Sequence, residues 1–217
     1  MRCVHEAGQC TRPRLWVSAI VLAAGAGQRM GGVAKCLLKD EQGTLIEQQI
    51  RALQEAGTNE ITVVLGHFGD AVAANIAALG VCSRKHSRED HSQFDSLRLG
   101  VGGISSEAQA VLVVPADMPL LGSEHYIQAI AAFKKRPEHC FYSGPWCRET
   151  PGHPVVFEPN YLRAKVSSPR PIASGNWRSR DDPEGWHWST DDSRFTVDID
   201  RPEDLRDLRH KWQKTLS

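Results

Sequence analysis

The stretch "IVLAAGAGQRMGGVAKCLL", Ile20–Leu38, passes from an apolar run into a glycine-rich turn and then to an arginine and a lysine. A strand that leads through such a turn binds phosphate well, because backbone N–H groups converge there and small residues let a ligand approach the main chain. Arg29 and Lys35 add two cations suited to a polyphosphate, the first as a planar fork and the second as a point charge. This pattern predicts a nucleoside triphosphate site; a tight connection with solvent-facing charges is the alternative.

Two familiar phosphate-binding turns do not match these letters. A P-loop ends in Gly-Lys followed by Ser or Thr, whereas Val33 follows the last glycine pair here. The dinucleotide fingerprint finds Gly25 and Gly27 but meets Met30 at its third glycine position, and the next apolar run, "ITVVLGHF", ends without an acidic residue for a ribose. An NAD(P)-dependent reductase is therefore disfavoured, and it is kept as the competing enzyme class.

Size and charge narrow the range of partners. The 217 residues are 41% hydrophobic, which is enough to bury a substantial core in one domain. Lys plus Arg and Asp plus Glu both number 26, so the net charge is +0 and no basic footprint for nucleic acid is present. No apolar run approaches the ~20 residues of a membrane span, and the first residues lack the apolar core of a signal peptide. We expect small-molecule substrates, neither nucleic acid nor membrane as partner, and a cytoplasmic protein whose six cysteines are free thiols.

Apolar runs alternate with segments of helical period, which predicts an α/β fold: a Rossmann-like three-layer sandwich with a mostly parallel sheet. Strands are expected at 16–22, 61–65, 81–84, 110–114, 140–143, 154–157 and 195–199, and helices at 44–56, 70–79, 123–134 and from 202 to about 212. The stretch "FDSLRLGVGGI" is interpreted as a helix that weakens at its glycines. The strand at 110–114 runs directly into "PADMPLL", so Asp117 lies just past the carboxyl end of a strand.

The chain is interpreted as one domain, 16–217, preceded by an extension at 1–15 for which partial disorder or a misplaced start codon is left open. Within the domain, 167–194 is polar and rich in turn residues, which predicts a long loop or lid. The tryptophans at 177, 186 and 188 are too concentrated there for ordinary core residues. They are expected to stack on a pterin-like ring or to bury an interface.

The sequence resembles the nucleotidyltransferases of the molybdenum cofactor group, within the NTP transferase superfamily, and the cytidylyltransferase branch more than the guanylyltransferase branch. Six stretches carry the resemblance between residues 17 and 208: "LAAGAGQRMG" followed by Lys35, "VVLGHFGDAV", "FDSLRLGV", "PADMPLL", "GHPVVF" and "DIDRPEDL". The departures lie on the acceptor side, where "SGNWRSR" replaces the usual glycine- and alanine-containing stretch, and "ADMP" resembles the guanylyl branch equally well. The resemblance implies a fold of the nucleotide-diphospho-sugar transferase type.

The resemblance also implies site residues. It assigns nucleotide contacts to Leu22, Ala23, Ala24, Gly25, Gly27, Arg29, Lys35 and Ser96, with Ser96 near the base or ribose. Arg29, Lys35 and Asp117 are expected to be the catalytic residues, and His153 is expected to contact the acceptor. Asp117, together with Asp198 or Asp200, is expected to bind Mg²⁺, with Mn²⁺ as an alternative. Asp198 and Asp200 alternate along an expected strand and so share one face, and either has the alternative of capping the following helix.

The expected reaction is the Mg²⁺-dependent transfer of a nucleoside monophosphate, by resemblance CMP from CTP, to a phosphorylated acceptor, by resemblance molybdopterin, with release of pyrophosphate. A phosphate nucleophile is already an anion, so the chemistry needs cations and alignment and no serine, cysteine or histidine nucleophile. The alternatives are a sugar phosphate, a polyol phosphate or a polar lipid precursor as acceptor, GTP as donor, or a nucleotide-binding chaperone that delivers a cofactor. A molybdoenzyme or a cofactor chaperone is the candidate protein partner.

Overall fold

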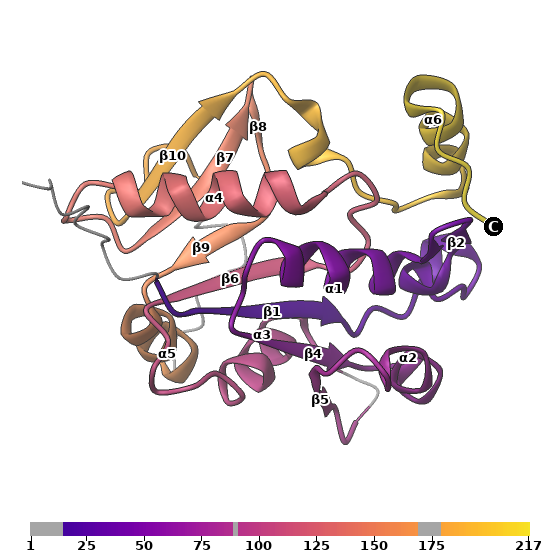
Figure 1. Cartoon of the computed structure of the whole chain (residues 1–217), viewed down its shortest axis with the longest axis horizontal. Coiled ribbons are helices and arrows are strands. Elements are labelled where there is room, and N and C mark those ends of the chain that lie inside the picture. Colours follow the sequence, from indigo (N-terminus) through magenta and orange to yellow (C-terminus); the bar gives the residue numbers. More distant parts are fainter. Residues whose placement is uncertain (1–14, 89–90, 169–178) are drawn as a thin grey trace, which may run out of the picture.

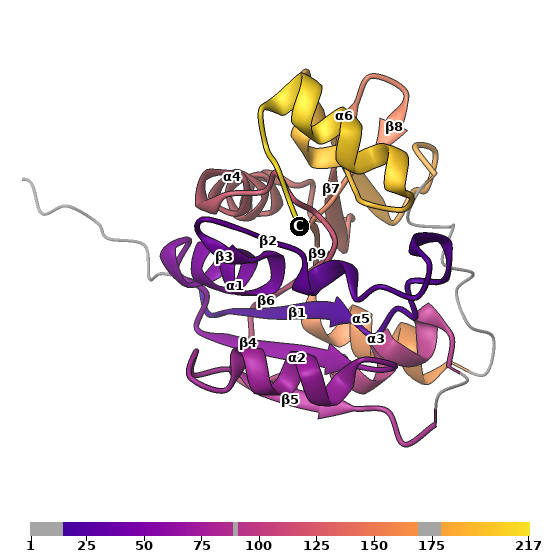
Figure 2. The same cartoon turned by 90° about the vertical axis from the view of Figure 1, so that its right-hand side faces the viewer.

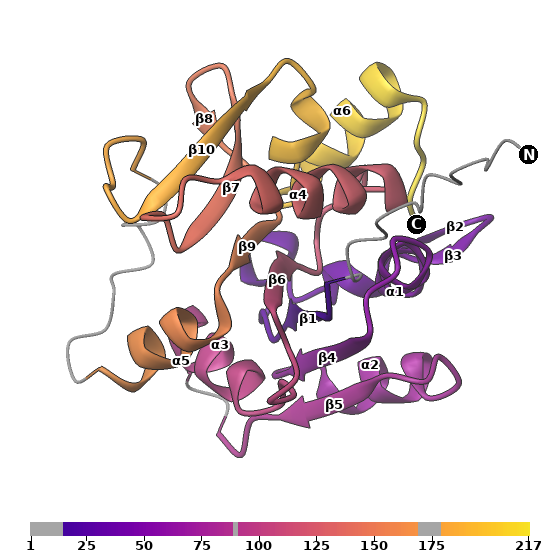
Figure 3. The same ribbon diagram turned by 60° about the vertical axis from the view of Figure 1, so that its left-hand side comes forward.

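The structure is a computed structural model that describes residues 15–88, 91–168 and 179–217. Its centre is an eight-stranded sheet in the order β10-β7-β9-β6-β1-β4-β5, with β8 pairing to β7; Figure 3 shows this order from β10 and β7 at the top to β5 at the bottom. The strands are β1 (Val17–Ala23), β4 (Glu60–Leu65), β5 (Cys82–Lys85), β6 (Ala110–Pro115), β7 (Tyr142–Cys147), β8 (Thr150–Pro151), β9 (Val155–Phe157) and β10 (Gly185–Thr190). The neighbours β5, β4, β1 and β6 are all parallel, and β9 runs antiparallel to β6 and β7. The predicted α/β fold with a mostly parallel sheet is confirmed.

Helices cover both faces of this sheet, as Figures 1 and 2 show: in Figure 2, α1 and α4 lie to the left and α3 and α5 to the right. The helices are α1 (Leu45–Glu55), α2 (Gly69–Ile76), α3 (Gln93–Val101), α4 (Ser123–Lys135), α5 (Pro159–Ser167) and α6 (Pro202–Trp212). Within the described residues, no helix combines the length and the apolar character needed to cross a membrane.

The side chains of β1 alternate between two apolar layers, which is why its sequence is apolar throughout. Ala19 and Val21 join the core under α1, α2 and α4, whereas Ile20 joins the core under α3 and α5. Successive residues of a strand point to opposite faces, so a strand covered on both sides is apolar at every position. Ile20 is fully buried, and burial of such a side chain contributes roughly 1.5–3 kcal/mol to stability.

Local signals in the sequence position α1 and α3. Thr44 caps α1 in a capping box with Glu47, and Ser92 caps α3 in the same way with Asp95. The glycine at 100 allows α3 to approach the sheet, because a Cβ at Gly100 would lie 2.5 Å from Ile20 Cγ2. The sequence suggested that this helix weakens at its glycines. At Gly100, however, the absence of a side chain allows α3 to pack closely against the sheet.

A third apolar cluster joins the segments that surround the glycine-rich turn. It contains Met30, Leu38, Leu45, Ile199, Leu208 and Leu216. Figure 2 shows α6 above the small hairpin of β2 (Lys39–Asp40) and β3 (Gly43–Thr44). The last residue, Ser217, exchanges backbone hydrogen bonds with Lys39 at 3.0 and 2.9 Å. The segment after α6 thus packs beside the glycine-rich turn.

Part of the predicted loop at 167–194 is a strand. Residues 185–190 form β10, which pairs in parallel with β7, whereas 169–178, including the tryptophan at 177, lie outside the described residues, as do 1–14 of the predicted extension. Trp188 is only 9% exposed and packs edge-on against Phe195, and Trp186 packs partly against the same core. The prediction of a loop whose tryptophans lie outside the core was wrong for 185–190. Although this segment is polar in sequence, it pairs with β7 and buries Trp188 against Phe195.

The strand predicted at 195–199 is absent. Residues 193–196 form a short 3₁₀ helix, η4 (Ser193–Thr196), and 197–200 continue as extended chain. Phe195 and Ile199 are both fully buried, but they belong to different apolar clusters. The alternation of apolar residues therefore comes from two separate packing contacts. Asp198 and Asp200 lie on this extended chain, which the Ile199 amide ties to the Asp117 carbonyl at 3.0 Å.

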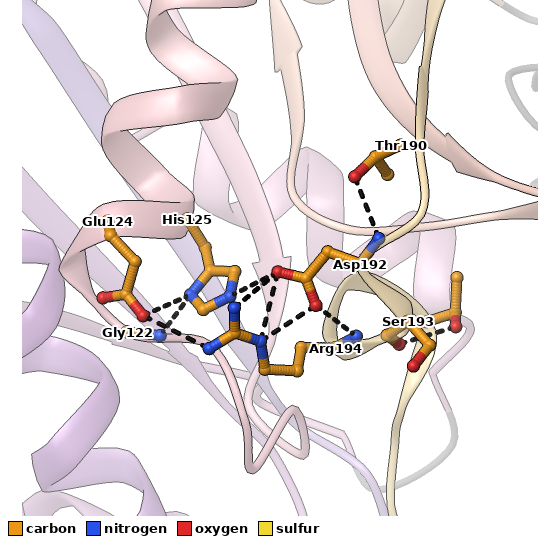
Figure 4. Close-up of polar contacts among 8 residues, drawn as sticks. Gly122, Glu124, His125, Thr190, Asp192, Ser193 and Arg194 are labelled. Carbon is orange, nitrogen blue, oxygen red and sulfur yellow. Dashed lines mark hydrogen bonds and ion pairs between the residues drawn. The ribbon is translucent and has the colours of Figure 1, made fainter.

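A polar network fixes the segment that leads to these aspartates, and Figure 4 shows its side chains converging between α4 and η4. The Gly122 amide donates to Nδ1 of the buried His125 at 2.9 Å, and His125 Nε2 lies 3.3 Å from Asp192 Oδ2. Arg194 donates from Nη2 to Asp192 Oδ2 at 2.7 Å and from Nε to Asp192 Oδ1 at 2.9 Å. The network joins the start of α4, just after the end of β6, to the chain that follows β10.

Candidate active site

A cavity of about 550 Å³ opens at the carboxyl ends of β1, β4 and β6. In a mostly parallel sheet this edge is where ligands bind, because the loops there diverge from the strand ends. The residues that line the cavity are Leu22, Ala24, Gly25, Ala26, Gly27, Gln28, Arg29, Lys35, His67, His91, Gln93, Ser96, Pro115, Asp117 and Asp200. Residues predicted from four separate motifs thus meet around one space.

The turn after β1 has a backbone that requires glycine. Gly27 has a φ of 60°, in the left-handed region, and a Cβ there would overlap the Val33 carbonyl oxygen. The amides of Met30 and Gly32 both donate to the Gly27 carbonyl, at 2.8 and 3.0 Å, which closes the turn. Among the described residues, no group accepts from the amides of Gly25 and Ala26, so these N–H groups are available to a ligand.

Lys35 lies between two carboxylates at the floor of this cavity. Its Nζ is 2.6 Å from Asp200 Oδ1 and 3.6 Å from Asp117 Oδ2. Arg29 contacts the other oxygen of the same carboxylate, with Nη1 2.6 Å from Asp200 Oδ2. The two cations of the glycine-rich turn and two of the three predicted metal ligands therefore form one ionic cluster, in which Asp200 holds both cations.

The carboxylates of this cluster differ in proton affinity. Burial, with the nearby charges of Asp198 and Asp200, raises the pKa of Asp117 to about 6, against the opposing effect of Lys35. The pKa of Asp198 is also raised, by loss of hydration and by the Asp200 charge, although its side chain reaches solvent. Hydrogen bonds from Lys35, and the charges of Lys35 and Arg29, hold the pKa of Asp200 below its usual range. An additional cation near Asp117 would favour its ionised form.

The residues that could hold a metal are two carboxylates rather than three. Among the residues that the structure describes, no group of three or more His, Cys, Asp or Glu side chains is arranged to hold an ion. Asp117 and Asp200 line the cavity and converge on the ammonium of Lys35, so a cation already occupies the space between them; Asp198 does not line the cavity. Two carboxylates fit Mg²⁺, which takes few protein ligands and completes its shell with phosphates and water.

The other end of the cavity carries neutral hydrogen-bonding groups. Ser96, which is 3% exposed, forms a hydrogen bond with His86 Nε2 at 3.0 Å, and its hydroxyl lies 3.2 Å from the Ser92 carbonyl. The His86 ring stacks on the His91 ring with centroids 3.9 Å apart, and burial is the main cause that lowers the pKa of His86. Ser96 therefore lies in the wall of the cavity, in contact with histidines that the sequence patterns did not indicate.

A second, smaller cavity of about 60 Å³ adjoins the first and shares Leu22 and Gln93 with it. Its other lining residues are Phe94, Leu97, Val113, Gly144, Pro145, Pro151, Gly152, His153, Val155, Phe157 and His187. Within the part of the chain that the structure describes, no carboxylate, lysine or arginine lines it. His153, predicted to contact the acceptor, thus lies beside the larger cavity but not in it.

Most of the predicted site residues meet around the larger cavity, with three exceptions. Ala23 points into the core, where it is 7% exposed, His153 lies in the second cavity, and Asp198 lines neither. The lining residues that the predictions missed are Ala26, Gln28, His67, His91, Gln93 and Pro115. The place of His67 directly after a predicted parallel strand was a signal for the site.

Comparison with known proteins gives the family of the chain. The model of the MobA-like NTP transferase domain family matches residues 19–171. The chain is 29% identical over 125 residues to the bifunctional protein GlmU of Sorangium cellulosum, which covers 55% of this chain and 26% of that protein. It is 38% identical over 60 residues to the CTP:phosphoglutamine cytidylyltransferase of Campylobacter jejuni, covering 26% of this chain and 24% of that protein.

The fold comparison extends over almost the whole chain. A nucleotidyl transferase from Methanothermobacter thermautotroptrophicus superposes with a TM-score of 0.74 at 23% identity, covering 91% of this chain and 98% of that one. The chain spans about a quarter of the length of the curated relatives that it matches. Because the family model matches well over half of the sequence and includes the glycine-rich turn and Asp117, the chain belongs to the family of MobA-like NTP transferase domains.

Proposed function

We propose that the protein is a Mg²⁺-dependent nucleotidyltransferase that transfers CMP from CTP to a phosphorylated acceptor and releases pyrophosphate. The observation that carries the proposal is the ionic cluster of Arg29, Lys35, Asp117 and Asp200 beside a glycine-rich turn, in a cavity of about 550 Å³. Family membership supports the reaction class. The identities of donor, metal and acceptor belong to the proposal.

The triphosphate binds at the cations and the turn. Arg29 and Lys35 leave Asp200 for the phosphate oxygens, since a polyphosphate offers more charge than one carboxylate, and the free amides of Gly25 and Ala26 donate to the same group. The Lys35 side chain is 17% exposed, against 67% for that of Arg29. Lys35 therefore turns to the phosphates from the wall of the cavity, and Arg29 closes over them from solvent.

Asp117 and Asp200 would hold the Mg²⁺. When Lys35 turns to the phosphates, the two carboxylates that converge on it are left without their cation. A bound Mg²⁺ neutralises charge on the phosphates and on the departing pyrophosphate. The raised pKa of Asp117 fits this role, since a buried carboxylate among other carboxylates gains most from a cation.

The chain's own residues supply alignment and charge to the transfer. An oxygen of the acceptor phosphate attacks the α-phosphorus, the new P–O bond forms, and the bond to the pyrophosphate oxygen breaks. Arg29 and Lys35 take up the negative charge that develops on the pyrophosphate. No described side chain is needed as a nucleophile. Burial raises the pKa of the nearby Cys36 thiol to about 12, so this thiol stays protonated and unreactive.

The second cavity is assigned to the acceptor. It adjoins the nucleotide cavity through Leu22 and Gln93, so an acceptor with its phosphate in the larger space can extend into the smaller one past His153. Molybdopterin is the acceptor that the resemblance implies, and a molybdoenzyme would then receive the product. A sugar or polyol phosphate is the competing acceptor, and GTP the competing donor. The cytidylyltransferase among the relatives supports CTP.

The first test is binding of ATP, GTP, CTP and UTP, each with and without Mg²⁺, measured as a shift in the thermal unfolding temperature. The expected result is a Mg²⁺-dependent shift that is largest with CTP. A preference for GTP moves the donor assignment to the guanylyl branch, and no shift with any nucleotide rejects the proposal.

Two variants then test the assigned roles. Asp117→Asn is expected to remove most turnover while the protein stays folded, because the change removes a metal ligand with little change in volume. Arg29→Ala is expected to weaken triphosphate binding and slow turnover together, and Arg209→Ala, an exposed arginine on α6, is the matched control. Wild-type kinetics in both Asp117→Asn and Arg29→Ala would contradict the assignment of the site.

A further inference from the structure

The order of the strands fixes which end of the cavity would receive a nucleotide's base. Along the sheet edge the strands follow the order β6, β1, β4, β5. Asp117 follows β6, the glycine-rich turn follows β1, His67 follows β4 and His86 follows β5. The groups assigned to the triphosphate therefore lie on the β6–β1 side, and the histidines lie on the β4–β5 side. A nucleotide whose phosphates reach Arg29 and Lys35 extends its base toward the histidines.

Two of these histidines form a stack at the cavity wall. The rings of His86 and His91 are 3.9 Å apart at their centroids and inclined by only 8°. His91 lines the cavity, whereas His86 is not among the lining residues. His91 is therefore the inner ring of the pair as seen from the nucleotide, and His86 supports it.

Hydrogen bonds to Ser96 determine how the stack is held. The Ser96 hydroxyl lies 3.2 Å from the Ser92 carbonyl, to which it can donate, and 3.0 Å from His86 Nε2. His91 Nδ1 lies 3.5 Å from the same oxygen. One buried hydroxyl on α3 thus orients His86 and lies within reach of His91.

The remaining edge of His91 is wedged against the end of β4. A Cβ added at Gly66 would lie 2.6 Å from His91 Nε2 and would overlap the Ala24 carbonyl oxygen. The His91 Nε2 atom is itself buried, without a hydrogen-bond partner among the described residues. Because this edge is closed off, His91 does not offer the nitrogen to the cavity. It can contribute to the wall mainly through its ring surface.

We infer that the base of the nucleotide stacks on His91 and extends the His86–His91 pair into a pile of three rings. The inference rests on the proposed function, since it requires a nucleotide in this cavity. The recognised group is any planar heteroaromatic base, because stacking is tolerant of base identity. His91 therefore contributes affinity for the nucleoside half of the ligand, and the choice among bases is made by the groups at the ring edges, Ser96 and the main chain near Ala24.

The test separates the base from the phosphates by using two probes, CTP and inorganic tripolyphosphate, each with Mg²⁺, titrated calorimetrically. His91→Ala is expected to bind CTP about tenfold or more weakly than the wild type, as is typical of losing one base–aromatic stack. Its affinity for tripolyphosphate is expected to stay unchanged. His91→Phe keeps a flat ring and is expected to bind CTP within about threefold of the wild type. His139→Ala removes an exposed histidine elsewhere and is the matched control.

Each outcome decides the inference. A selective loss of CTP binding in His91→Ala together with retention in His91→Phe supports stacking. Unchanged CTP binding in His91→Ala overturns it, as does an equal loss of both probes, which would indicate damage to the whole cavity. A loss in His91→Phe as large as in His91→Ala also overturns it, because a hydrogen bond would then be responsible. If the wild type binds neither probe, it is the proposed function that fails.

Discussion

Lys35 is the residue on which the charge balance of the ligand-free site depends. Its ammonium lies within 3.6 Å of two carboxylates, Asp117 and Asp200, and it shares Asp200 with Arg29. In this arrangement the Asp200 carboxylate binds both cations, as a phosphate group would. The same carboxylate is a proposed metal ligand, so it competes with the nucleotide in the absence of metal and assists it when metal is present.

Substitution of Asp200 should therefore change two binding properties in opposite directions. Asp200→Asn is expected to bind tripolyphosphate without Mg²⁺ several-fold more tightly than the wild type, because the competing charge is gone. Its gain in CTP affinity on adding Mg²⁺ is expected to be smaller. Calorimetric titrations with and without Mg²⁺ measure both. Asp198→Asn is the matched control, since Asp198 does not line the cavity. A parallel loss of both affinities would show that Asp200 orders the site instead.

The raised pKa of Asp117 predicts how the stability of the ligand-free protein depends on pH. The folded pKa is about 6 and the ordinary value is 3.8, so between these values the folded state binds more protons than the unfolded state. The contribution of Asp117 to stability therefore falls as pH rises from about 4 to about 6, by at most roughly 1.4 kcal/mol per pH unit. Urea unfolding at several pH values should show a steeper fall in the wild type than in Asp117→Asn, which keeps only the part of the slope that comes from the raised pKa of Asp198.

A control for the Asp117 prediction is Asp207→Asn, which changes an exposed carboxylate on α6. That variant should keep the pH slope of the wild type. If Asp117→Asn also keeps it, the slope arises from another group and the elevated pKa of Asp117 is wrong.

At the scale of the element, the positions of β10 and η4 depend on contacts that no local sequence pattern indicates. β10 pairs with β7, and the chain after it is held by Asp192, which contacts both His125 and Arg194 (Figure 4). Tyr142 adds a second anchor by donating its hydroxyl to Asp182 at 2.8 Å just before β10. These contacts determine where the extended chain that carries Asp200 lies relative to the end of β6.

Removal of the Asp192 charge should weaken this attachment in a pH-dependent way. The hydrogen bonds from Arg194 are the largest cause that lowers the pKa of Asp192, so its contribution is present above the ordinary pKa and is lost as pH falls through the lowered value. Asp192→Asn is expected to lower the free energy of unfolding by roughly 1 kcal/mol at pH 7. The difference from the wild type should shrink below about pH 4. Asp191→Asn, an exposed neighbour, is the control.

Denaturant unfolding at pH 7 and at pH 3 measures the effect. A difference that persists unchanged at pH 3 would mean that the ionised carboxylate is not what holds the segment.

The sequence predicted the elements that have a strong local pattern and missed those that depend on distant partners. The apolar run of β1, the glycine-rich turn and Asp117 are each recognisable within a few letters, because strand, turn and carboxylate are adjacent. The strand β10 was taken for a loop, since only its tryptophans are apolar and its pairing partner is remote in the chain. His86 and His91 were missed because their stack is a contact between rings, which no spacing encodes.

At the scale of the molecule, the segment after α6 completes the surroundings of the glycine-rich turn. Leu216 belongs to the same apolar cluster as Met30. Lys214 Nζ lies 3.0 Å from Asp40 Oδ2 and donates to Gln48 Oε1 at 2.8 Å. These contacts tie a segment far along the chain to the turn that follows the first strand.

Deletion of residues 214–217 is therefore expected to lower the free energy of unfolding by roughly 2–4 kcal/mol, through loss of a buried leucine and of several hydrogen bonds. It is also expected to weaken tripolyphosphate binding, because Met30 loses a packing partner. Calorimetry and urea unfolding measure the two effects. Arg206→Ala, on the exposed surface of α6, should change neither. Full tripolyphosphate affinity in the deletion would show that the turn holds its conformation alone.

The ionic cluster at the floor of the cavity also has a consequence for the speed of encounter. Two cations, Arg29 and Lys35, face two carboxylates, Asp117 and Asp200, so the cluster carries a net charge of 0 when all four groups are ionised (2 − 2). A basic funnel accelerates the arrival of a polyanion and slows it as salt is added. The ionic cluster of this cavity has no net positive charge that would attract a free triphosphate. A nucleotide whose charge is partly neutralised by its own metal ion should enter faster than the bare anion, at a rate that stays nearly constant as ionic strength rises.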